Sequence, residues 1–561
     1  MKHFRLTFGL LLLLFLLPFS AHAAEKLTGF YVSSTAATEE GTLPADAVSW
    51  YQHNSRYYLF LPGTADASKM YVYYTGVSEI SLNDQPIANG DVFSFTVGEA
   101  VKLRVGNKKS SYSVQVMQGS HIPTLFIETE SGSLKTIEAS KENKEKGTLL
   151  AIDENGQTLY DGNLAHIKIR GNMSTRFNKK SYTIKLEKST DMFGFGKTKK
   201  WVLIGNARDK SLLRNQITYD MAQYVGLAYS PDCRQVEVYI NHEYRGTYLF
   251  SDKIQISDAS VDITDLEEAT ELLNEQALET YPKVGSTKPS IREYKAYDIP
   301  SIPEDITGGY LVEYEIYTSR YEEELSAYYT THKRVLVVKD PEVISTEQAE
   351  YIFSFMQGFE NAIFAEDGID PDTGKHYSEF VDMESLVKKF MIEEISKNYD
   401  ANNSSQYFYK PSDSESEKAY CGPVWDYDSA YGSYARAAGT KSYLSPKGLQ
   451  QTTNSAAWWP RLYEKSDFVS AVCETWQSAF APAIRVLLGQ ETDESGVLQS
   501  IEQYAENIRA SADMNFIRWP MKQSSNNSAK TGKTYEANID YLTKFISERY
   551  DFLQEEWGTR E

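Results

Sequence analysis

Hydrophobic and polar residues alternate in short segments between residue 25 and about residue 118. Residues 57–61, 70–74 and 112–116 show this alternation, and an Asn-Asp pair at 83–84 is one of several turn signals between such segments. A period of two is typical of half-buried strands, and frequent turns are typical of two-sheet folds. The pattern predicts a small Ig-like β-sandwich over residues 25–118.

Strand and helix patterns alternate between residues 122 and about 440. An apolar strand pattern opens this region at 122–127, and extended patterns around turn residues predict hairpins at 166–186 and 235–250. Apolar residues at helical spacing predict a helix over 209–225. Together these patterns predict a mixed α+β core.

Two other stretches have a different composition. The segment 258–306 is polar and acidic and contains glycine and proline, so we predict an insertion or lid outside the core. Beyond residue 440, apolar stripes at 468–480 and 539–550 predict helices, so residues 441–561 form a helical C-terminal region.

The first 23 residues follow the pattern of a signal peptide. Lys2 and Arg5 provide positive charge, residues 10–17 are apolar, and Ala21-His22-Ala23 is a small-x-small cleavage site. A retained membrane anchor is the alternative, but the apolar run is short for a span. We therefore expect residues 1–23 to be removed, leaving a secreted protein with no transmembrane segment.

Composition excludes several functional classes. The chain has 561 residues, enough for several domains, and a net charge of -21, which disfavours nucleic acid as a partner. Three cysteines make neither a disulfide framework nor a zinc motif. The sequence also lacks the Gly-x-Ser-x-Gly, His-Glu-x-x-His and dinucleotide-binding patterns.

The first candidate for chemistry is the turn of the hairpin at 166–186. Gly171 lets backbone N–H groups approach a phosphate, and Lys185 on the second strand can neutralise phosphate charge. Lys185 shares a strand face with Ser181 and Thr183. A polar-faced hairpin with a solvated lysine is the alternative interpretation, which spacing alone favours.

Three aspartates form the second candidate. Asp400 precedes a strand, and Asp426 and Asp428 are two residues apart, so both can face one pocket if the chain is extended there. Phosphoryl transfer uses one aspartate as a base for the acceptor hydroxyl and another as a Mg²⁺ ligand. Turn aspartates, or a loop stabilised by Ca²⁺, are the alternatives.

Five sequence blocks in order resemble the spore-coat protein H (CotH) kinase-like family. The blocks are RGNMST with KKSYTIKL, WVLI with DKSLLRN, VYIN with YRGTYL, GGYLVE, and the late acidic motifs at Asp400 and WDYD. They span most of residues 122–432. The resemblance implies an atypical protein-kinase-like core with two lobes and ATP between them, preceded by the β-sandwich.

The resemblance also implies roles for particular residues. Asp400 would be the catalytic base, and Asp426, supported by Asp428, would bind Mg²⁺ or Mn²⁺. The residues implied for nucleotide binding are Arg170, Gly171, Asn172, Ser174, Lys185, Asp209, Arg214 and Glu313.

Four positions depart from the family pattern. Met173 is an extra residue in the phosphate turn, His242 replaces a turn glycine, and Asp252 stands where glutamate is usual. Ser405 occupies the place of a metal-binding asparagine, although asparagines at 402 and 403 are near. For Lys185, both Asp209 and Asp252 are candidate carboxylate partners.

The resulting hypothesis is a secreted Ser/Thr protein kinase that uses ATP with Mg²⁺ or Mn²⁺. Its substrate would be a surface or coat protein, either the chain itself or a basic Ser/Thr-rich protein. The alternative is a non-catalytic surface, coat or carbohydrate-associated module with the same fold. Lys185, Asp400 and Asp426 favour the enzyme, whereas Ser405 and the leading β-sandwich favour the alternative.

Overall fold

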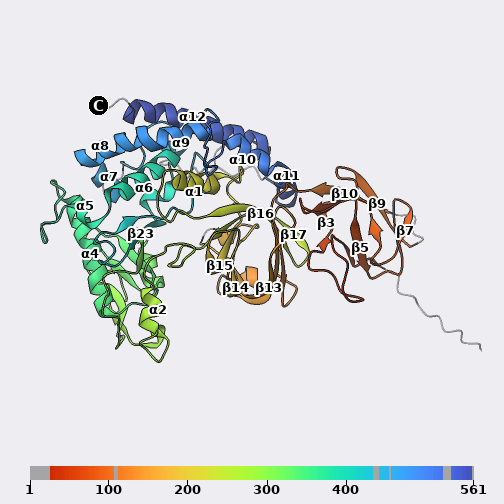
Figure 1. Ribbon diagram of the computed structural model, residues 1–561, viewed down its shortest axis with the longest axis horizontal. Helices are drawn as coiled ribbons and strands as arrows, with labels where there is room; N and C mark the ends of the chain where they lie inside the picture. Colours follow the sequence, from red (N-terminus) through yellow and green to blue (C-terminus); the bar gives the residue numbers. More distant parts are fainter. Residues whose placement is uncertain are drawn as a thin grey trace, which may run out of the picture.

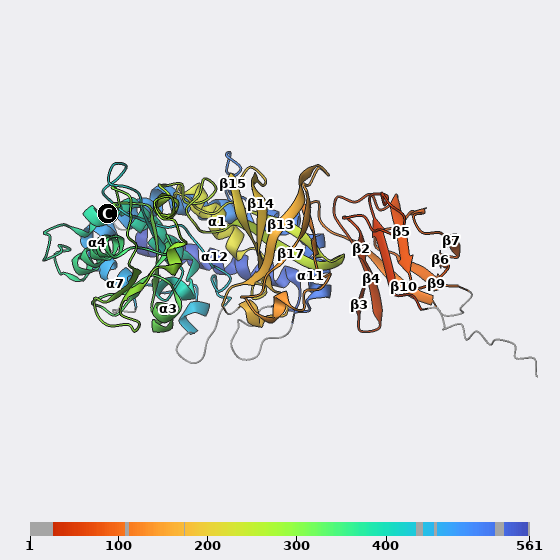
Figure 2. The same ribbon diagram turned by 90° about the horizontal axis from the view of Figure 1, so that it is seen from below.

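The computed structural model describes residues 26–106, 111–172, 174–433, 441–453, 457–521 and 532–558. The expected signal peptide and Met173 lie outside these residues. The molecule is elongated, with a β module at one end, a barrel in the middle, and a second sheet with most helices at the other end (Figures 1 and 2).

The N-terminal module consists of two β-sheets with a shared apolar core. Its strands are β1 (Gly29–Ser33), β2 (Val48–Ser49), β3 (Tyr51–His53), β4 (Arg56–Leu61), β5 (Met70–Thr75), β6 (Ile80–Leu82), β7 (Gln85–Ile87), β8 (Val92–Phe93), β9 (Ala100–Val105) and β10 (Ser111–Gln118). The sheet orders are β2-β1-β5-β8 and β3-β4-β10-β9-β6-β7. Val32 and Val72 from one sheet and Leu59 and Leu103 from the other belong to one buried cluster.

The middle of the chain forms a closed barrel, which the sequence did not predict. Its strands are β11 (Thr124–Thr129), β12 (Glu145–Ile152), β13 (Thr158–Arg170), β14 (Ser181–Asp191), β15 (Lys197–Ile204), β16 (Cys233–Ile240) and β17 (Glu243–Asp252), in the order β11-β12-β13-β14-β15-β17-β16. Closure comes from parallel pairing of β11 with β16. Both predicted hairpins are present, as β13–β14 and β16–β17.

The helix predicted over 209–225 begins later than expected. Helix α1 spans Arg214–Tyr224, because a tight turn, with Leu212 at a positive φ of 63°, occupies the preceding residues. The Asp209 carboxylate accepts a hydrogen bond from the backbone N–H of Arg214 at 2.8 Å and so supports the first turn of the helix. Gly226, at φ 70°, follows the C-terminus of the helix.

The second sheet overturns the prediction that residues 258–306 lie outside the core. Its strands are β18 (Lys283–Gly285), β19 (Tyr294–Tyr297), β20 (Tyr310–Glu315), β21 (Ala327–Tyr329), β22 (Val335–Asp340), β23 (Gln406–Lys410) and β24 (Tyr420–Cys421), in the order β18-β19-β21-β22-β20-β23-β24. Two of these strands and helix α2 (Leu266–Glu271) come from 258–306. Leu266 and Ala296 are buried in the main apolar cluster. In the segment 258–306 the apolar residues are dispersed among acidic ones, so the local composition did not indicate that these elements are buried.

Helices dominate the chain after residue 440, as predicted. The helices that follow α2 are α3 (Thr318–Glu323), α4 (Thr346–Phe364), α5 (Tyr377–Phe380), α6 (Met383–Ser396), α7 (Trp458–Tyr463), α8 (Ser466–Thr475), α9 (Ala481–Leu487), α10 (Ile501–Asn507), α11 (Arg509–Arg518) and α12 (Tyr535–Trp557). Among them, α11 packs against β17 of the barrel. The two predicted stripes pack into the main cluster. Within the described residues, no helix is long and apolar enough to cross a membrane.

The mixed α+β class is therefore confirmed, whereas the kinase-like two-lobed arrangement and the domain boundaries stay predictions.

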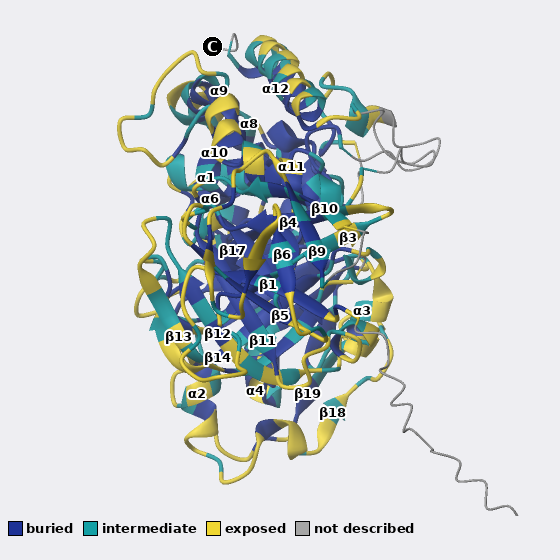
Figure 3. Ribbon diagram, turned by 90° about the vertical axis from the view of Figure 1, so that its right-hand side faces the viewer, coloured by how far each residue is buried: buried dark blue, intermediate teal, exposed yellow. Residues whose placement is uncertain are grey.

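Buried residues run through the sheets, and exposed residues concentrate in the loops and on the outer helix faces (Figure 3).

The N-terminal module is packed firmly against the rest of the molecule. Its apolar cluster includes Phe126, Tyr239 and Tyr244 of the barrel and Met514 of α11. The Tyr239 hydroxyl donates to the carbonyl of Phe60 at 3.1 Å, which ties the barrel to the module. The module is thus fixed in orientation by a shared core.

One buried carboxylate lies where the module, the barrel and α11 meet. Glu237 on β16 accepts hydrogen bonds from the Ser511 hydroxyl at 2.8 Å and from the Gly63 backbone N–H at 3.3 Å. Burial raises the pKa of Glu237 to about 8, although both hydrogen bonds act to lower it. The junction therefore favours the neutral carboxyl group.

This burial predicts a pH-dependent stability. The folded protein retains a proton on Glu237 that the unfolded chain releases above its usual pKa of 4.5, so stability falls as the pH rises from about 4.5 toward 8. Glu237→Gln cannot ionise and should melt at a higher temperature than wild type at pH 8, but not at pH 4.5. The exposed Glu187→Gln is the control in thermal melts. A melting difference that is independent of pH would contradict this assignment.

Candidate active site

A cleft of about 2140 Å³ lies between strands of the barrel and the segments that carry the three aspartates. Almost all predicted site residues line it: Arg170, Gly171, Asn172, Ser174, Lys185, Asp209, Glu313, Asp400, Asp426 and Asp428. Arg214 is the exception. Folding therefore gathers residues that are up to 258 positions apart in sequence around one space.

Asp400 lies in a short 3-10 turn, Tyr399–Asn402, between α6 and β23. The side chain of Asn398 caps the turn by accepting the backbone N–H of Asp400 at 3.1 Å. Burial, followed by the neighbouring charges of Asp426 and Asp428, raises the pKa of Asp400 to about 8, while Arg208 opposes the rise. Such a carboxyl group holds a proton more tightly than a free aspartate does.

Asp426 and Asp428 follow β24 in an irregular segment. Asp426 has a positive φ of 66°, and its side chain is open to the solvent of the cleft although protein surrounds it. Burial raises the pKa of Asp426, opposed by Arg170 and Arg208. Burial and the charge of Asp426 raise the pKa of Asp428 to about 7. The three aspartates form one electrostatically coupled group.

The donor set of this group fits a magnesium ion shared with a phosphate ligand. In the described part of the chain, no cluster of three or more His, Cys, Asp or Glu residues is arranged to hold a metal by itself. Mg²⁺ is usually held by one or two carboxylates together with waters and substrate phosphates. Asp426, open to the cleft and next to Asp428, matches that requirement.

A buried hydrogen-bond network joins the Asp400 turn to the Asp426–Asp428 segment. The Glu393 carboxylate of α6 accepts from the Tyr427 hydroxyl at 2.6 Å and from the Asn398 side chain at 3.0 Å. Lys389, also fully buried, provides the counter-charge. Because one carboxylate contacts both segments, their relative positions are fixed.

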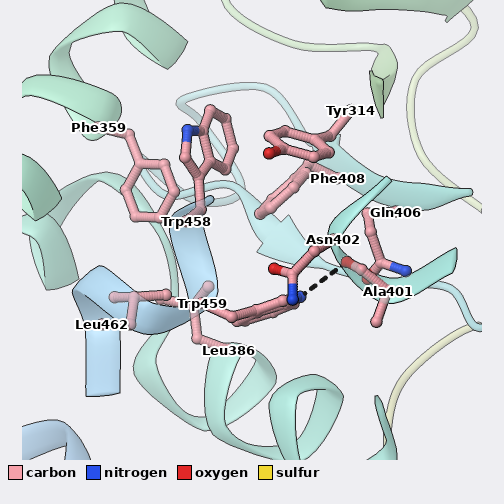
Figure 4. A pocket seen from close by; sticks show the side chains of 10 residues that line it. All are labelled: Tyr314, Phe359, Leu386, Ala401, Asn402, Gln406, Phe408, Trp458, Trp459 and Leu462. Carbon is pink, nitrogen blue, oxygen red and sulfur yellow. Dashed lines mark hydrogen bonds between the residues drawn. The ribbon is translucent and has the colours of Figure 1, made fainter. Parts of the chain in front are cut away.

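An apolar floor supports the Asp400 turn from below (Figure 4). Trp458 and Trp459 at the start of α7 are buried there, and the Trp459 indole N–H donates to the carbonyl of Ala401 at 3.1 Å. Asn402 points toward this floor and donates to the Gln451 side chain at 2.9 Å. Asn402 is thus engaged away from the cleft.

Ser405 stands where a metal-binding asparagine is expected. Ser405, at φ 57°, lines the cleft, whereas Asn402 and Asn403 do not. Asn403 donates to the carbonyl of Tyr399 at 2.6 Å within its own turn. Neither asparagine substitutes for the missing ligand in this structure.

Arg214, unlike Asp209, does not line the cleft. Arg214 is buried away from the cleft, where it pairs with Asp209 and donates to the carbonyl of Ala430 at 3.0 Å. The adjacent Asn215 accepts the backbone N–H of Tyr427 at 2.7 Å. The arginine thereby helps to hold the aspartate segment in place, and its expected role in nucleotide binding stays a prediction.

A row of basic side chains crosses the barrel wall of the cleft. His166, Lys185 and Lys200 are cross-strand neighbours on β13, β14 and β15. Burial, then the charge of Lys200, lowers the pKa of Lys185. Within the described residues neither lysine forms a salt bridge. Asp209 and Asp252, the expected partners of Lys185, are instead buried next to Arg214 and opposite Trp201.

Glu313 lies on β20 at the opposite wall. Burial raises the pKa of Glu313, while Lys339 and Arg320 lower it. Arg320 lies 3.6 Å from Glu313 and 3.2 Å from Glu315. Glu313 thus belongs to an ion-pair network at the edge of the cleft.

The sequence reading missed Arg208. Its guanidinium donates to the Ser429 hydroxyl at 3.1 Å, stacks 5.4 Å above the Phe177 ring, and offsets the charge of all three aspartates. The signal was available, because Arg208 directly precedes the DKSLLRN block.

Comparisons with known proteins identify the family of the chain. The profile of the CotH kinase protein family matches residues 167–553, which contain every predicted site residue. No curated protein matches the chain. A solved structure from Bacteroides thetaiotaomicron, provisionally described as a glycoside hydrolase, shares 12% identity over 59% of this chain and 87% of its own, with a TM-score of 0.13. Nothing about this chain follows from so low a score.

The family match over residues 167–553 indicates a kinase-like protein. The chain belongs to the CotH kinase protein family.

The buried Arg214–Asp209 pair predicts a large stability loss on substitution. Arg214→Ala leaves the Asp209 carboxylate buried without its counter-charge, which should cost about 3–5 kcal/mol in urea denaturation. Arg234→Ala removes a partly exposed pair with Glu154 and should cost less than about 1 kcal/mol. Equal, small losses in both variants would show that Arg214 does not hold the segment.

Proposed function

We propose that this protein is an extracytoplasmic kinase that transfers the γ-phosphate of ATP to Ser or Thr of surface or coat proteins. The observation that carries the proposal is the pairing, across one cleft, of three coupled aspartates with a row of lysines that have no carboxylate partner among the described residues. Lysines of this kind are suited to phosphate, and the aspartates to a metal ion and an acceptor hydroxyl.

The charge balance of the cleft supports an anionic ligand. Among the described residues that line it, 13 are Lys or Arg and 11 are Asp or Glu. The whole chain has 57 basic and 78 acidic residues. The cleft is thus basic relative to a strongly acidic protein, which favours a nucleotide there.

The turn at Gly171 supports phosphate binding at its backbone. Gly171 has φ 93°, and a Cβ atom there would lie 2.0 Å from the Ser174 hydroxyl, so only glycine fits. The Ser174 hydroxyl donates to the carbonyl of Arg170 at 3.1 Å and closes the turn. Gly171 has no side chain and is exposed in the cleft, which leaves its backbone open to a phosphate group.

In the proposed reaction each residue has a limited task. In its ionised form, Asp400 accepts the proton of the acceptor hydroxyl. The hydroxyl oxygen bonds to the γ-phosphorus while the bond from that phosphorus to the β–γ bridging oxygen breaks. Lys185 and Lys200 hold phosphate oxygens. Mg²⁺ or Mn²⁺, when bound by Asp426 and Asp428, would supply positive charge to the nucleotide phosphates. The signal-peptide pattern supports action outside the cytoplasm.

A non-catalytic surface module is the second candidate function. It is favoured by Ser405, together with the engagement of Asn402 and Asn403 away from the cleft. Without an asparagine ligand, a second metal ion has fewer protein contacts.

Three substitutions distinguish the proposed roles. Asp400→Asn should preserve nucleotide binding and lower phosphate transfer by about a hundredfold or more, because the base contacts the acceptor. Asp426→Asn should also weaken binding of Mg·ATP. Lys185→Ala should reduce nucleotide affinity, whereas Lys197→Ala, exposed on β15, is the matched control. The measurements are calorimetric nucleotide binding and transfer of labelled γ-phosphate.

If wild type binds no nucleotide, or if all three variants transfer phosphate as well as wild type does, the kinase function is excluded. The surface-module function would then take its place.

A further inference from the structure

The cleft is larger than a nucleotide requires. Its volume is about 2140 Å³, whereas small-molecule sites usually measure about 300–1,000 Å³. If ATP occupies part of it, as the proposed function requires, space remains for a second and larger ligand. The lining residues indicate where that space lies.

The cleft extends past the phosphate turn toward the N-terminal module. His166, opposite Lys185, is four residues before Arg170, so the lysine row lies about 13 Å behind the turn along β13. On the other side of the turn, toward the module, the Lys179 side chain donates a hydrogen bond to the Asn515 side chain of α11 at 2.8 Å. Helix α11 lies between the barrel and the module (Figure 1).

Four side chains form what we term the module end of the cleft: Tyr51, His53, Arg518 and Trp519. The first two come from β3 of the module, and the others end α11 or follow it. The Arg518 guanidinium lies 4.5 Å from the Tyr51 ring centre and 4.4 Å from that of Trp519. The stack is held in place because Arg518 donates to the carbonyl of Tyr244 at 3.1 Å.

The surroundings of the module end are basic. Lys141 and Arg176 line the cleft and are exposed, as is Glu142. Two further acidic residues nearby are already paired: Glu138 with Arg245, and Glu243 with Arg518 at 3.7 Å. In a chain with net charge -21, a basic surface next to the phosphate turn points to an acidic ligand.

We propose that the module end binds the acceptor, an acidic polypeptide segment in extended conformation that delivers its hydroxyl group to Asp400. The N-terminal module is then part of the substrate site. Fixed aromatic rings and a stacked arginine suit a polypeptide, because they provide contact area with little loss of side-chain entropy. The rigid core shared by module, barrel and α11 keeps this surface in register with the aspartates.

The test uses the full chain with two probes, fluorescein-labelled dephosphorylated casein as an acidic polypeptide and a labelled histone as a basic one. Binding is followed by fluorescence anisotropy without nucleotide. Wild type should bind casein more tightly than histone. Tyr51→Ala combined with His53→Ala should weaken casein binding about tenfold and leave ATP affinity unchanged.

Two control variants isolate the surface. Tyr71→Ala changes a half-buried tyrosine of the module that does not line the cleft, and it should bind casein like wild type. Lys141→Glu should weaken casein binding and strengthen histone binding, whereas Lys146→Glu, exposed outside the cleft, should change neither.

The proposal is overturned if casein does not bind, if the double variant binds it as wild type does, if Tyr71→Ala loses as much affinity, or if histone binds more tightly. Nucleotide binding measured in parallel separates the two proposals. A chain that binds casein at the module end but no nucleotide would retain this docking surface and lose the kinase function.

Discussion

The buried carboxylate of Glu393 is the contact on which the candidate site depends. Asp400, Asp426 and Asp428 repel one another, so their segments would separate unless something held them. The Glu393 carboxylate accepts hydrogen bonds from Asn398, which caps the Asp400 turn, and from the hydroxyl of Tyr427, which lies between Asp426 and Asp428. Burying an ion is costly, and here Lys389 and the hydrogen bonds offset that cost. The Arg214–Asp209 pair supports the same segment from the other side.

The two walls of the cleft carry charges of opposite sign, which suits a ligand that contains both a metal ion and phosphates. Carboxylates crowded on one wall keep raised pKa values, and a lysine beside other lysines on the opposite wall keeps a lowered one. On both walls burial is the largest cause of the pKa shift and like charge adds to it, and a metal-bound polyphosphate would offset both effects. This shared relief makes a nucleotide a better match for the cleft than a neutral ligand, and it explains why an acidic protein retains a basic barrel wall.

Local patterns in the sequence predicted local structure. They did not predict features that depend on contacts between distant parts of the chain. Alternation identified both barrel hairpins, and helical spacing identified the stripes that contain Phe468 and Leu542. Closure of the barrel depends on pairing of β11 with β16, over a hundred residues later. Sequence motifs identified the site residues but did not show that Arg214 is buried. A motif does not distinguish a residue that contacts the ligand from one that supports the surrounding chain. The contact of Glu237 with Ser511, 274 positions apart, leaves no local signal.

The most direct test of a phosphate-binding cleft is the thermal stability of the purified chain with ATP, with and without Mg²⁺. A ligand at a hundred times its dissociation constant stabilises the folded state by about 2.7 kcal/mol. The account predicts a clear rise in Tm with ATP and Mg²⁺ together, a smaller rise with ATP alone, and loss of the metal-dependent part in Asp426→Asn. An unchanged Tm at millimolar ATP and Mg²⁺ would contradict it.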